Sequence, residues 1–366
     1  MNVTGWLKMI SGGNREWYAD LSRLGLSLAS LPYGLVSELR NRAYHCGAFP
    51  VRGVSVPVIS VGNLTVGGTG KTPTVAWVVR QLKELGEHPA ILSRGYRALD
   101  DSENDEKKLL DSLCQNVPHQ QGPDRLKSAA KLLSGSHVTV FVLDDGFQHR
   151  RMHRDLDIVL LDALNPFGYG HLLPRGLLRE RCAGLSRADL VLLTRCDLIP
   201  APEIESIRQT IRRWTSAPIL RTQFEPTGFV NGEGKSFPLG WIDGKKVFAF
   251  CGIGNPEGFR QTLSVHTAIE NNQFASFPDH HHYTGFDLSQ LHRQAQKERA
   301  DIFITTRKDL VKLPVDGIHG LPCLGLEIEL KFLDDPQPLF QMLRLVFSPA
   351  DREFTGSTCR TLPENR

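Results

Sequence analysis

The sequence lacks the cysteine pattern of a disulfide-stabilised or zinc-binding protein. Its seven cysteines are odd in number, are scattered over 366 residues and form no C-x-x-C pair. Secreted domains that depend on disulfides pair their cysteines within short chains, and structural zinc sites need closely spaced thiolates. We therefore expect reduced thiols and a cytoplasmic protein.

The chain also lacks a strong excess of one charge, a long apolar run and internal repeats. Its formal net charge is +3, which gives no argument for nucleic acid as a partner. No segment supplies the ~20 apolar residues of a transmembrane helix, and the N-terminus does not begin like a secretory signal. A hydrophobic content of 40% is that of an ordinary globular protein, and the length predicts two domains.

One N-terminal segment allows two interpretations. Residues 17–44 have an apolar middle that is broken by Pro32, and they end with Arg40 and Arg42. The segment is typical of a helix packed on the body of the protein. It is equally typical of a helix in a bilayer interface, with aromatic side chains near the headgroups and arginines on anionic lipid.

After this segment, apolar runs and helical periodicity alternate. The helical pattern covers residues 71–86, and continuous apolar runs cover residues 56–64, 88–96, 138–146, 156–163 and 188–198. Runs of this kind predict parallel strands that helices bury on both faces. A shift to glycine and proline at residues 225–240 predicts a boundary, and a smaller α/β unit follows. The predicted division is an N-terminal helical segment (1–50), a core domain (51–235), a smaller C-terminal α/β lobe (236–347) and a polar tail (348–366).

The stretch SVGNLTVGGTGKTP, residues 60–73, resembles a phosphate-binding loop. The pattern G-x-x-x-x-G-K-[ST] is matched except at Thr65, which replaces the first glycine. A strand before the loop and a helix after it are the context in which this motif binds nucleotide phosphates. We therefore predict a P-loop NTPase-like sheet in which the loop works despite Thr65.

The remaining residues of the loop have defined tasks. The glycines leave backbone N–H groups free to face phosphate oxygens, and the helix N-terminus adds positive potential. Lys71 is expected to reach the β- and γ-phosphates, and the Thr72 hydroxyl is expected to bind Mg²⁺.

A second strand ends in acidic residues. The run VTVFVLDDGFQHRR places Asp144 and Asp145 at the end of an apolar strand, and polar residues follow at 148–151. In phosphate-loop proteins an acid at this place assists Mg²⁺ binding. Adjacent carboxylates are unfavourable without a cation, so this pair supports a metal–phosphate site.

Two further clusters remain ambiguous from pattern alone. The acidic run at residues 100–108 is typical of a helix N-terminus, where carboxylates offset the dipole. The histidines at 280–282 lack further ligands at zinc spacing, whereas His280 with an acid from elsewhere would suffice for an acid–base dyad.

Several motifs in one order resemble the tetraacyldisaccharide 4'-kinase (lipid A 4'-kinase) family. They are GNLTVGGTGKTP, LSRGY (92–96), GPDR (122–125), DDGFQHRR, LLPRGLLRE (172–180), FPDHHHYT and TTRKDLVKL (305–313), spanning residues 56–313. In this family the loop is written with a threonine at the position of Thr65. The resemblance implies ATP- and Mg²⁺-dependent phosphorylation of the 4'-hydroxyl of an acylated glucosamine disaccharide 1-phosphate. It also implies a peripheral enzyme at the cytoplasmic face of the bacterial inner membrane and an active site between two lobes. An enzyme for a lipid with four acyl chains must reach the bilayer interface, so residues 1–50 are then expected to form an amphipathic membrane-associating helical segment.

The resemblance also implies roles for individual residues. The family's base is an aspartate in a G-D-E segment; Asp105 and Glu106 match it here, although Asn104 replaces the glycine. Arg307 stands where the family usually has glutamate. The implied roles are catalysis by Asp105, His280 and Lys71; ATP binding by Thr65, Val66, Gly67, Gly68, Thr69, Gly70, Lys71 and Thr72; Mg²⁺ binding by Thr72, Asp144 and Glu106; and substrate binding by Asp145, Gln148, His149, Arg125, Arg179, Glu180 and Tyr96.

Two alternatives remain at this point. A phosphate-loop GTPase or metallochaperone is suggested by LLTRCDL, which resembles a guanine-reading T/N-K-x-D motif with Arg195 in place of lysine. A non-catalytic ATP-binding regulator would bind ATP without transferring phosphate. Nucleotide competition tests the first alternative, and a transfer assay tests the second.

Overall fold

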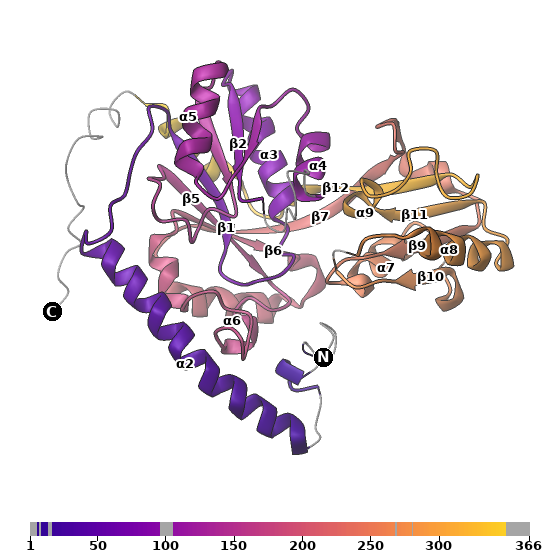
Figure 1. The fold of residues 1–366 in the computed structure, drawn as a ribbon, viewed down its shortest axis with the longest axis horizontal. Helices are drawn as coiled ribbons and strands as arrows, with labels where there is room; N and C mark the ends of the chain where they lie inside the picture. The colour runs from indigo at the N-terminus through magenta and orange to yellow at the C-terminus, as the bar shows by residue number, and fades with distance from the viewer. Residues whose placement is uncertain are drawn as a thin grey trace.

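The computed structural model describes residues 6, 9–13, 17–95, 105–267, 269–279 and 281–348. Two lobes lie side by side, and two long strands run from one lobe into the other (Figure 1). These strands are β7 (Ile219–Val230) and β12 (Cys323–Phe332). A long helix, α2 (Trp17–His45), lies on the outside of the first lobe, away from the second.

The first lobe carries the predicted parallel sheet. Its strands are β1 (Val58–Asn63), β2 (Pro89–Ser93), β3 (His119–Gln121), β4 (Val140–Asp144), β5 (Leu156–Asp162) and β6 (Leu190–Thr194). Its helices are α3 (Lys71–Glu84), α4 (Asp105–Leu113), α5 (Arg125–Gly135) and α6 (Ala201–Arg212). Every residue of β1, β2, β4 and β6 is buried, as expected for strands that helices cover on both faces.

The second lobe extends the same sheet. It contains β8 (Ser236–Phe237), β9 (Val247–Cys251), β10 (Phe274–Ser276) and β11 (Ile302–Thr306), with α7 (Pro256–Ser264), α8 (Gly285–Lys297) and α9 (Arg307–Leu310). The strand order is β10-β9-β11-β12-β7-β6-β5-β1-β4-β2-β3, with β8 beside β7. Neighbouring strands are parallel except where β7 meets β12 and β8. The predicted α/β fold with a second, smaller α/β lobe is confirmed.

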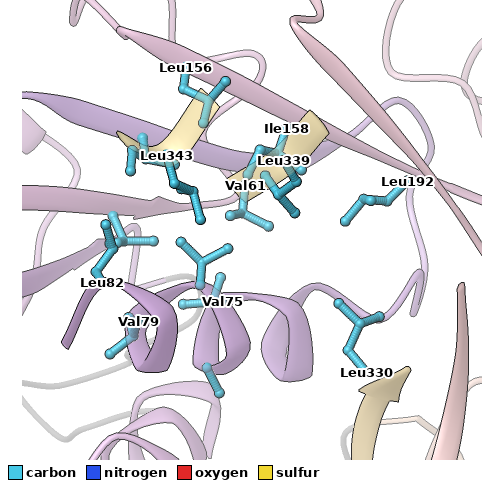
Figure 2. Close-up of a cluster of buried hydrophobic side chains, with 14 of the residues drawn as sticks. Val61, Val75, Val79, Leu82, Leu156, Ile158, Leu192, Leu330, Leu339 and Leu343 are labelled. Carbon is cyan, nitrogen blue, oxygen red and sulfur yellow. The ribbon is translucent and has the colours of Figure 1, made fainter. Parts of the chain in front are cut away.

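The largest core cluster lies around α3, the helix that follows the phosphate loop. Figure 2 shows Val75, Val79 and Leu82 of this helix beside Val61 and Ile158 of the sheet. Leu339 and Leu343 of α10 (Gln337–Leu345) belong to the same cluster. The chain therefore returns from the second lobe and ends its described part against the first.

The glycine- and proline-rich segment 225–240 is more regular than its composition predicts. Residues 225–230 complete β7, and β8 lies at 236–237. Pro226 pairs with Ile328 at a register shift of the β7–β12 ladder, where a residue without an N–H is tolerated. The segment is therefore part of the connection between the lobes rather than a loose linker. The division at residues 235 and 236 itself stays a prediction.

Candidate active site

The phosphate loop lies between β1 and α3, as the sequence predicts. Gly70 is the N-cap residue of α3 and has φ 88°, a left-handed conformation that favours glycine. A Cβ at Gly70 would lie 2.0 Å from Cζ of Phe224, so this glycine also allows a close approach of β7. A Cβ added at Gly67 or Gly68 would have no neighbouring atom within 4 Å, so these glycines leave the loop surface open.

Thr65 is buried and forms part of a small strand-like contact. It pairs antiparallel with Leu178, and the N–H of Val66 donates to the carbonyl of Leu177 at 2.8 Å. An extended residue at this position needs no left-handed freedom, so a glycine has no advantage here. Threonine can therefore replace the usual glycine, because the start of the loop pairs with the segment that contains Arg179 and Glu180.

Two residues at the end of β6 and directly after it contact the other end of the loop. The Thr194 hydroxyl donates to the carbonyl of Thr69 at 3.1 Å, and the Arg195 guanidinium donates to the carbonyl of Gly68 at 2.8 Å. Arg195 also forms an ion pair with Asp162 at the end of β5. From sequence, TRCD is an ordinary strand end with Asp197 as a cap or a weak guanine-reading motif, and neither interpretation predicts that Arg195 contacts the loop.

Lys71 and Asp145 lie together at the mouth of the loop. The Lys71 Nζ is 3.6 Å from Oδ1 of Asp145, and Nη1 of Arg179 lies 2.7 Å from both oxygens of that carboxylate. Burial opposes ionisation of Asp145, but Lys71 and Arg179 outweigh it and lower the pKa of the carboxyl. Asp145 is therefore ionised, and it holds Lys71 next to the loop.

Asp144 has a different environment from its neighbour. Its side chain is buried, and burial raises its pKa to about 7, with Asp145 and Glu106 adding to the rise while Lys71 and Arg125 oppose it. Its Oδ1 is buried without a hydrogen-bond partner among the described residues. A buried carboxylate oxygen that has no hydrogen-bond partner and lies beside a phosphate loop is suited to bind a cation.

This donor set fits magnesium better than a metal held by protein alone. Within the described ranges, no group of three or more His, Cys, Asp or Glu side chains is placed to hold a metal ion. Mg²⁺ usually takes one or two carboxylates and completes its octahedron with phosphates and water. Asp144 and the Thr72 hydroxyl at the start of α3 therefore fit Mg²⁺ bound together with a nucleotide.

Asp105 and Glu106 are the first two residues of α4, beside the loop helix. Glu106 acts electrostatically on Asp144, so the start of α4 lies near the end of β4. The Oδ2 of Asp105 lies 3.7 Å from Nζ of Lys312, a residue of the second lobe. His280 and Tyr96, which the sequence assigns to catalysis and substrate binding, lie outside the described residues.

The residues assigned to the sugar side form a connected polar network. Gln148 donates through Nε2 to Oε1 of Glu180 at 3.0 Å. Glu180 also accepts hydrogen bonds from Arg187 and Asn41. His149 is half-buried, and burial together with Arg125 and Arg154 lowers its pKa to about 4. Its imidazole is therefore neutral near pH 7. Arg125, at the start of α5, is buried and acts on both Asp144 and Asp145.

Helix α2 contacts this network with its inner face. The Tyr33 hydroxyl donates to the carbonyl of Arg179 at 2.9 Å, and Asn41 donates to Oε2 of Glu180 at 2.9 Å. Its outer face leaves a row of leucines exposed: Leu21, Leu24, Leu28, Leu31, Leu35 and Leu39. Among the described helices, none combines the length and apolar character that crossing a bilayer requires.

Comparisons with known proteins agree with these features. A sequence model of the tetraacyldisaccharide-1-P 4'-kinase family matches residues 22–347. The tetraacyldisaccharide 4'-kinase of Syntrophus aciditrophicus is 38% identical over 347 residues, which are 87% of this chain and 91% of that protein. The tetraacyldisaccharide 4'-kinase of Geobacter sulfurreducens is 38% identical over 365 residues, which are 93% of this chain and 98% of that protein.

A solved structure has the same fold. The crystal structure of LpxK from Aquifex aeolicus in complex with ATP superposes with a TM-score of 0.74 at 30% identity. The match covers 89% of this chain and 99% of that chain. The likeness therefore includes both lobes and is not limited to the phosphate-loop domain.

Proposed function

Since the chain belongs to the tetraacyldisaccharide-1-P 4'-kinase family, we propose that it transfers the γ-phosphate of ATP to the 4'-hydroxyl of tetraacyldisaccharide 1-phosphate. The product is the 4'-phosphorylated lipid A precursor (lipid IVA). The observation that carries the proposal is the convergence of the phosphate loop, the Asp144–Asp145 pair and Glu106, which follows Asp105 at the start of α4. A GTPase or metallochaperone is not favoured, because Arg195 pairs with Asp162 and the loop in place of the lysine of a guanine-reading motif. A non-catalytic regulator is not favoured, because the matched family and relatives are named as kinases.

The phosphate side of the reaction belongs to the loop. The Lys71 ammonium binds the β- and γ-phosphates together with the loop's backbone N–H groups, apart from those of Val66 and Thr69, which donate to the carbonyls of Leu177 and Gly67. The phosphate charge draws Lys71 from Asp145. Thr72, Asp144 and Glu106 are proposed to hold Mg²⁺, which neutralises phosphate charge when bound. The orphaned oxygen of Asp144 supports this assignment.

The acceptor side belongs to Asp105 and the polar network. Asp105 accepts the proton of the 4'-hydroxyl, and His280 is proposed to orient it. Asp145, Gln148, His149, Arg125, Arg179, Glu180 and Tyr96 are proposed to bind the sugar and its phosphate. With residues 51–235 binding the nucleotide and 236–347 forming the opposing lobe, closure excludes water and limits ATP hydrolysis.

The substrate requires access to lipid. We assign this to α2, whose exposed leucine row lies opposite the face that contacts Arg179 and Glu180. An amphipathic helix in the interface gives peripheral binding, here at the cytoplasmic face of the inner membrane. No nucleic acid partner is proposed.

The test is transfer of labelled γ-phosphate from Mg·ATP to tetraacyldisaccharide 1-phosphate in mixed micelles. The lipid is expected to become labelled with wild-type protein and with Lys83→Ala, a change on the exposed side of α3. Lys71→Ala should remove the label. ATP binding without transfer would contradict the proposed acceptor and leave a phosphate-loop protein that acts on something else.

A further inference from the structure

The motif TTRKDLVKL contains a lysine whose burial needs an explanation. Lys312 follows α9, and its side chain is only 3% exposed. An ammonium group carries three N–H donors and loses its hydration when buried, so each donor needs an acceptor. The neighbours of Lys312 therefore indicate what the residue does.

Two of the acceptors belong to the second lobe. The Nζ of Lys312 lies 3.1 Å from Oδ1 of Asp309 and 3.3 Å from the carbonyl oxygen of His281. Asp309 is itself fixed, because its Oδ2 accepts from the N–H of Gly252 at 2.9 Å and from the Thr306 hydroxyl at 2.7 Å. The ammonium is thus held in a defined place by groups of its own lobe.

The third neighbour belongs to the first lobe. Oδ2 of Asp105 lies 3.7 Å from the same ammonium, within ion-pair range but longer than a hydrogen bond. Asp105 stands at the first position of α4, next to Glu106 and close to the acidic pair that faces the phosphate loop. Lys312 therefore carries a positive charge across the gap between the lobes to this carboxylate.

We propose that Lys312 is a positioning residue for Asp105, an inference that rests on the proposed role of Asp105 as proton acceptor. The ammonium attracts Oδ2 and thereby orients the carboxylate, so Oδ1 is left to face the sugar hydroxyl. The hydroxyl proton moves to Asp105 while the oxygen bonds to the γ-phosphorus and the bond to ADP breaks. The base is then complete only when the second lobe is in place.

A purely structural role is the competing explanation. In that case Lys312 only neutralises the buried Asp309, and its loss would destabilise the second lobe without a specific effect on proton transfer. The two explanations differ in one respect. A positioning residue acts through Asp105, so its removal has no further effect once Asp105 can no longer accept a proton.

The experiment measures kcat, KM for ATP and thermal unfolding for four variants. They are Lys312→Met, the double variant Lys312→Met/Asp309→Asn, Asp105→Asn, and Asp105→Asn/Lys312→Met. The double variant with Asp309→Asn leaves no unpaired buried carboxylate and keeps the test valid if Lys312→Met alone fails to fold. Lys331→Met is the matched control, since its ammonium pairs with Glu225 at 2.7 Å on the exposed surface of β12.

We expect Lys312→Met/Asp309→Asn to unfold near the wild-type temperature, with kcat lowered roughly 10- to 100-fold and KM for ATP changed less than about twofold. In the Asp105→Asn background, Lys312→Met should lower kcat less than about twofold further. A wild-type kcat in Lys312→Met/Asp309→Asn would overturn the proposal. So would a loss of kcat from Lys312→Met that is the same in the wild-type background as in the Asp105→Asn background. Near-normal turnover of Asp105→Asn alone would also overturn it, by removing the base, while leaving the kinase reaction itself intact.

Discussion

Asp144 and Asp145 are adjacent in the chain but have opposite electrostatic environments. Asp145 faces Lys71 and Arg179, which lower its pKa although burial opposes them. Burial raises the pKa of Asp144 to about 7, although Lys71 and Arg125 oppose the rise. Asp145 has a left-handed backbone conformation, with φ 55°. Asp145 is thus paired with protein cations, whereas Oδ1 of Asp144 has no hydrogen-bond partner among the described residues, which supports its proposed role as a Mg²⁺ ligand.

The raised pKa of Asp144 predicts a pH dependence of nucleotide binding. Mg²⁺ binds the ionised carboxylate, so affinity for Mg·ATP should rise as pH increases through about 7. Titration calorimetry at pH 6, 7 and 8 measures this. The phosphates of ATP also titrate near a pH of about 6, so Asp144→Asn is the control. A pH profile that is identical in this variant would show that Asp144 does not contribute.

The same group also affects stability without ligand. The pKa of Asp144 is raised in the folded state. Between pH 3.8 and about 7 the folded protein therefore still binds a proton that the unfolded chain has already lost. Stability of the nucleotide-free protein is therefore expected to fall as pH rises across this window and to level off above it. In Asp144→Asn, thermal unfolding at pH 8 should occur at a higher temperature than in the wild type. A lower temperature would indicate that the carboxylate has a partner.

At the scale of elements, the phosphate loop depends on one close approach. Gly70→Ala introduces a Cβ 2.0 Å from the Phe224 ring and a left-handed alanine, which costs about 1–2 kcal/mol in backbone strain alone. ATP affinity is expected to fall at least about tenfold, because the loop must move to admit the methyl group. Gly135→Ala, where the added Cβ has no atom within 4 Å, is the matched control. Unchanged ATP affinity in Gly70→Ala would show that the Phe224 ring moves aside at little energetic cost.

Helix α2 provides the other prediction at this scale. Leu24, Leu28 and Leu31 are 59%, 60% and 67% exposed, and their spacing places them along one side of the helix. Replacing all three with glutamine should reduce co-sedimentation with anionic phospholipid vesicles and leave thermal stability unchanged, since none of them packs on the body. Glutamine at the exposed leucines 198, 333 and 345 is the control. Equal vesicle binding of both triple variants would show that α2 is not the lipid contact.

At the scale of the whole molecule, the two lobes share a sheet but differ in their connections. Between them run β7 and β12, with a register shift between Glu327 and Ile328. Side chains also meet across the gap: Arg307 of α9 pairs with Glu327 and donates to the Ser112 hydroxyl of α4 at 3.2 Å. Arg307 therefore has a structural role at the position where the family usually has glutamate.

This arrangement predicts closure when both substrates are bound. Fluorophores attached at Ser134 on α5 and Gln290 on α8, both exposed, report the distance between the lobes. The distance should shorten with a non-hydrolysable ATP analogue and acceptor lipid, because the acceptor must be enclosed between Asp105 and the loop. With Lys71→Ala the analogue should have little effect. An unchanged distance in the wild type would indicate that the lobes are already closed.

Much of this protein was predictable because the relevant patterns are local. The buried strands, the loop and its helix follow from continuous apolar runs, glycines and Gly-Lys-Thr within a few residues of one another. Asp144 and Asp145 were predictable for the same reason, as they end a strand. The smaller lobe was found from its own apolar runs, whereas proline and glycine at 225–240 concealed a strand because its ladder tolerates Pro226 at a register shift.

The sequence by itself determined the groups from which the proposed chemistry is built: a glycine-rich loop that ends in Gly-Lys-Thr, acids at a strand end and a helix start, and an N-terminal segment with an apolar middle. Only the tertiary structure decided which residues support them. Arg195 reaches the loop across 127 positions in the chain, and Lys312 reaches Asp105 from the other lobe. Contacts of this kind depend on how strands are ordered in a sheet, and no local pattern records that order. The same physical reason explains Thr65, which is an exception in the loop motif but an ordinary residue in its contact with Leu178.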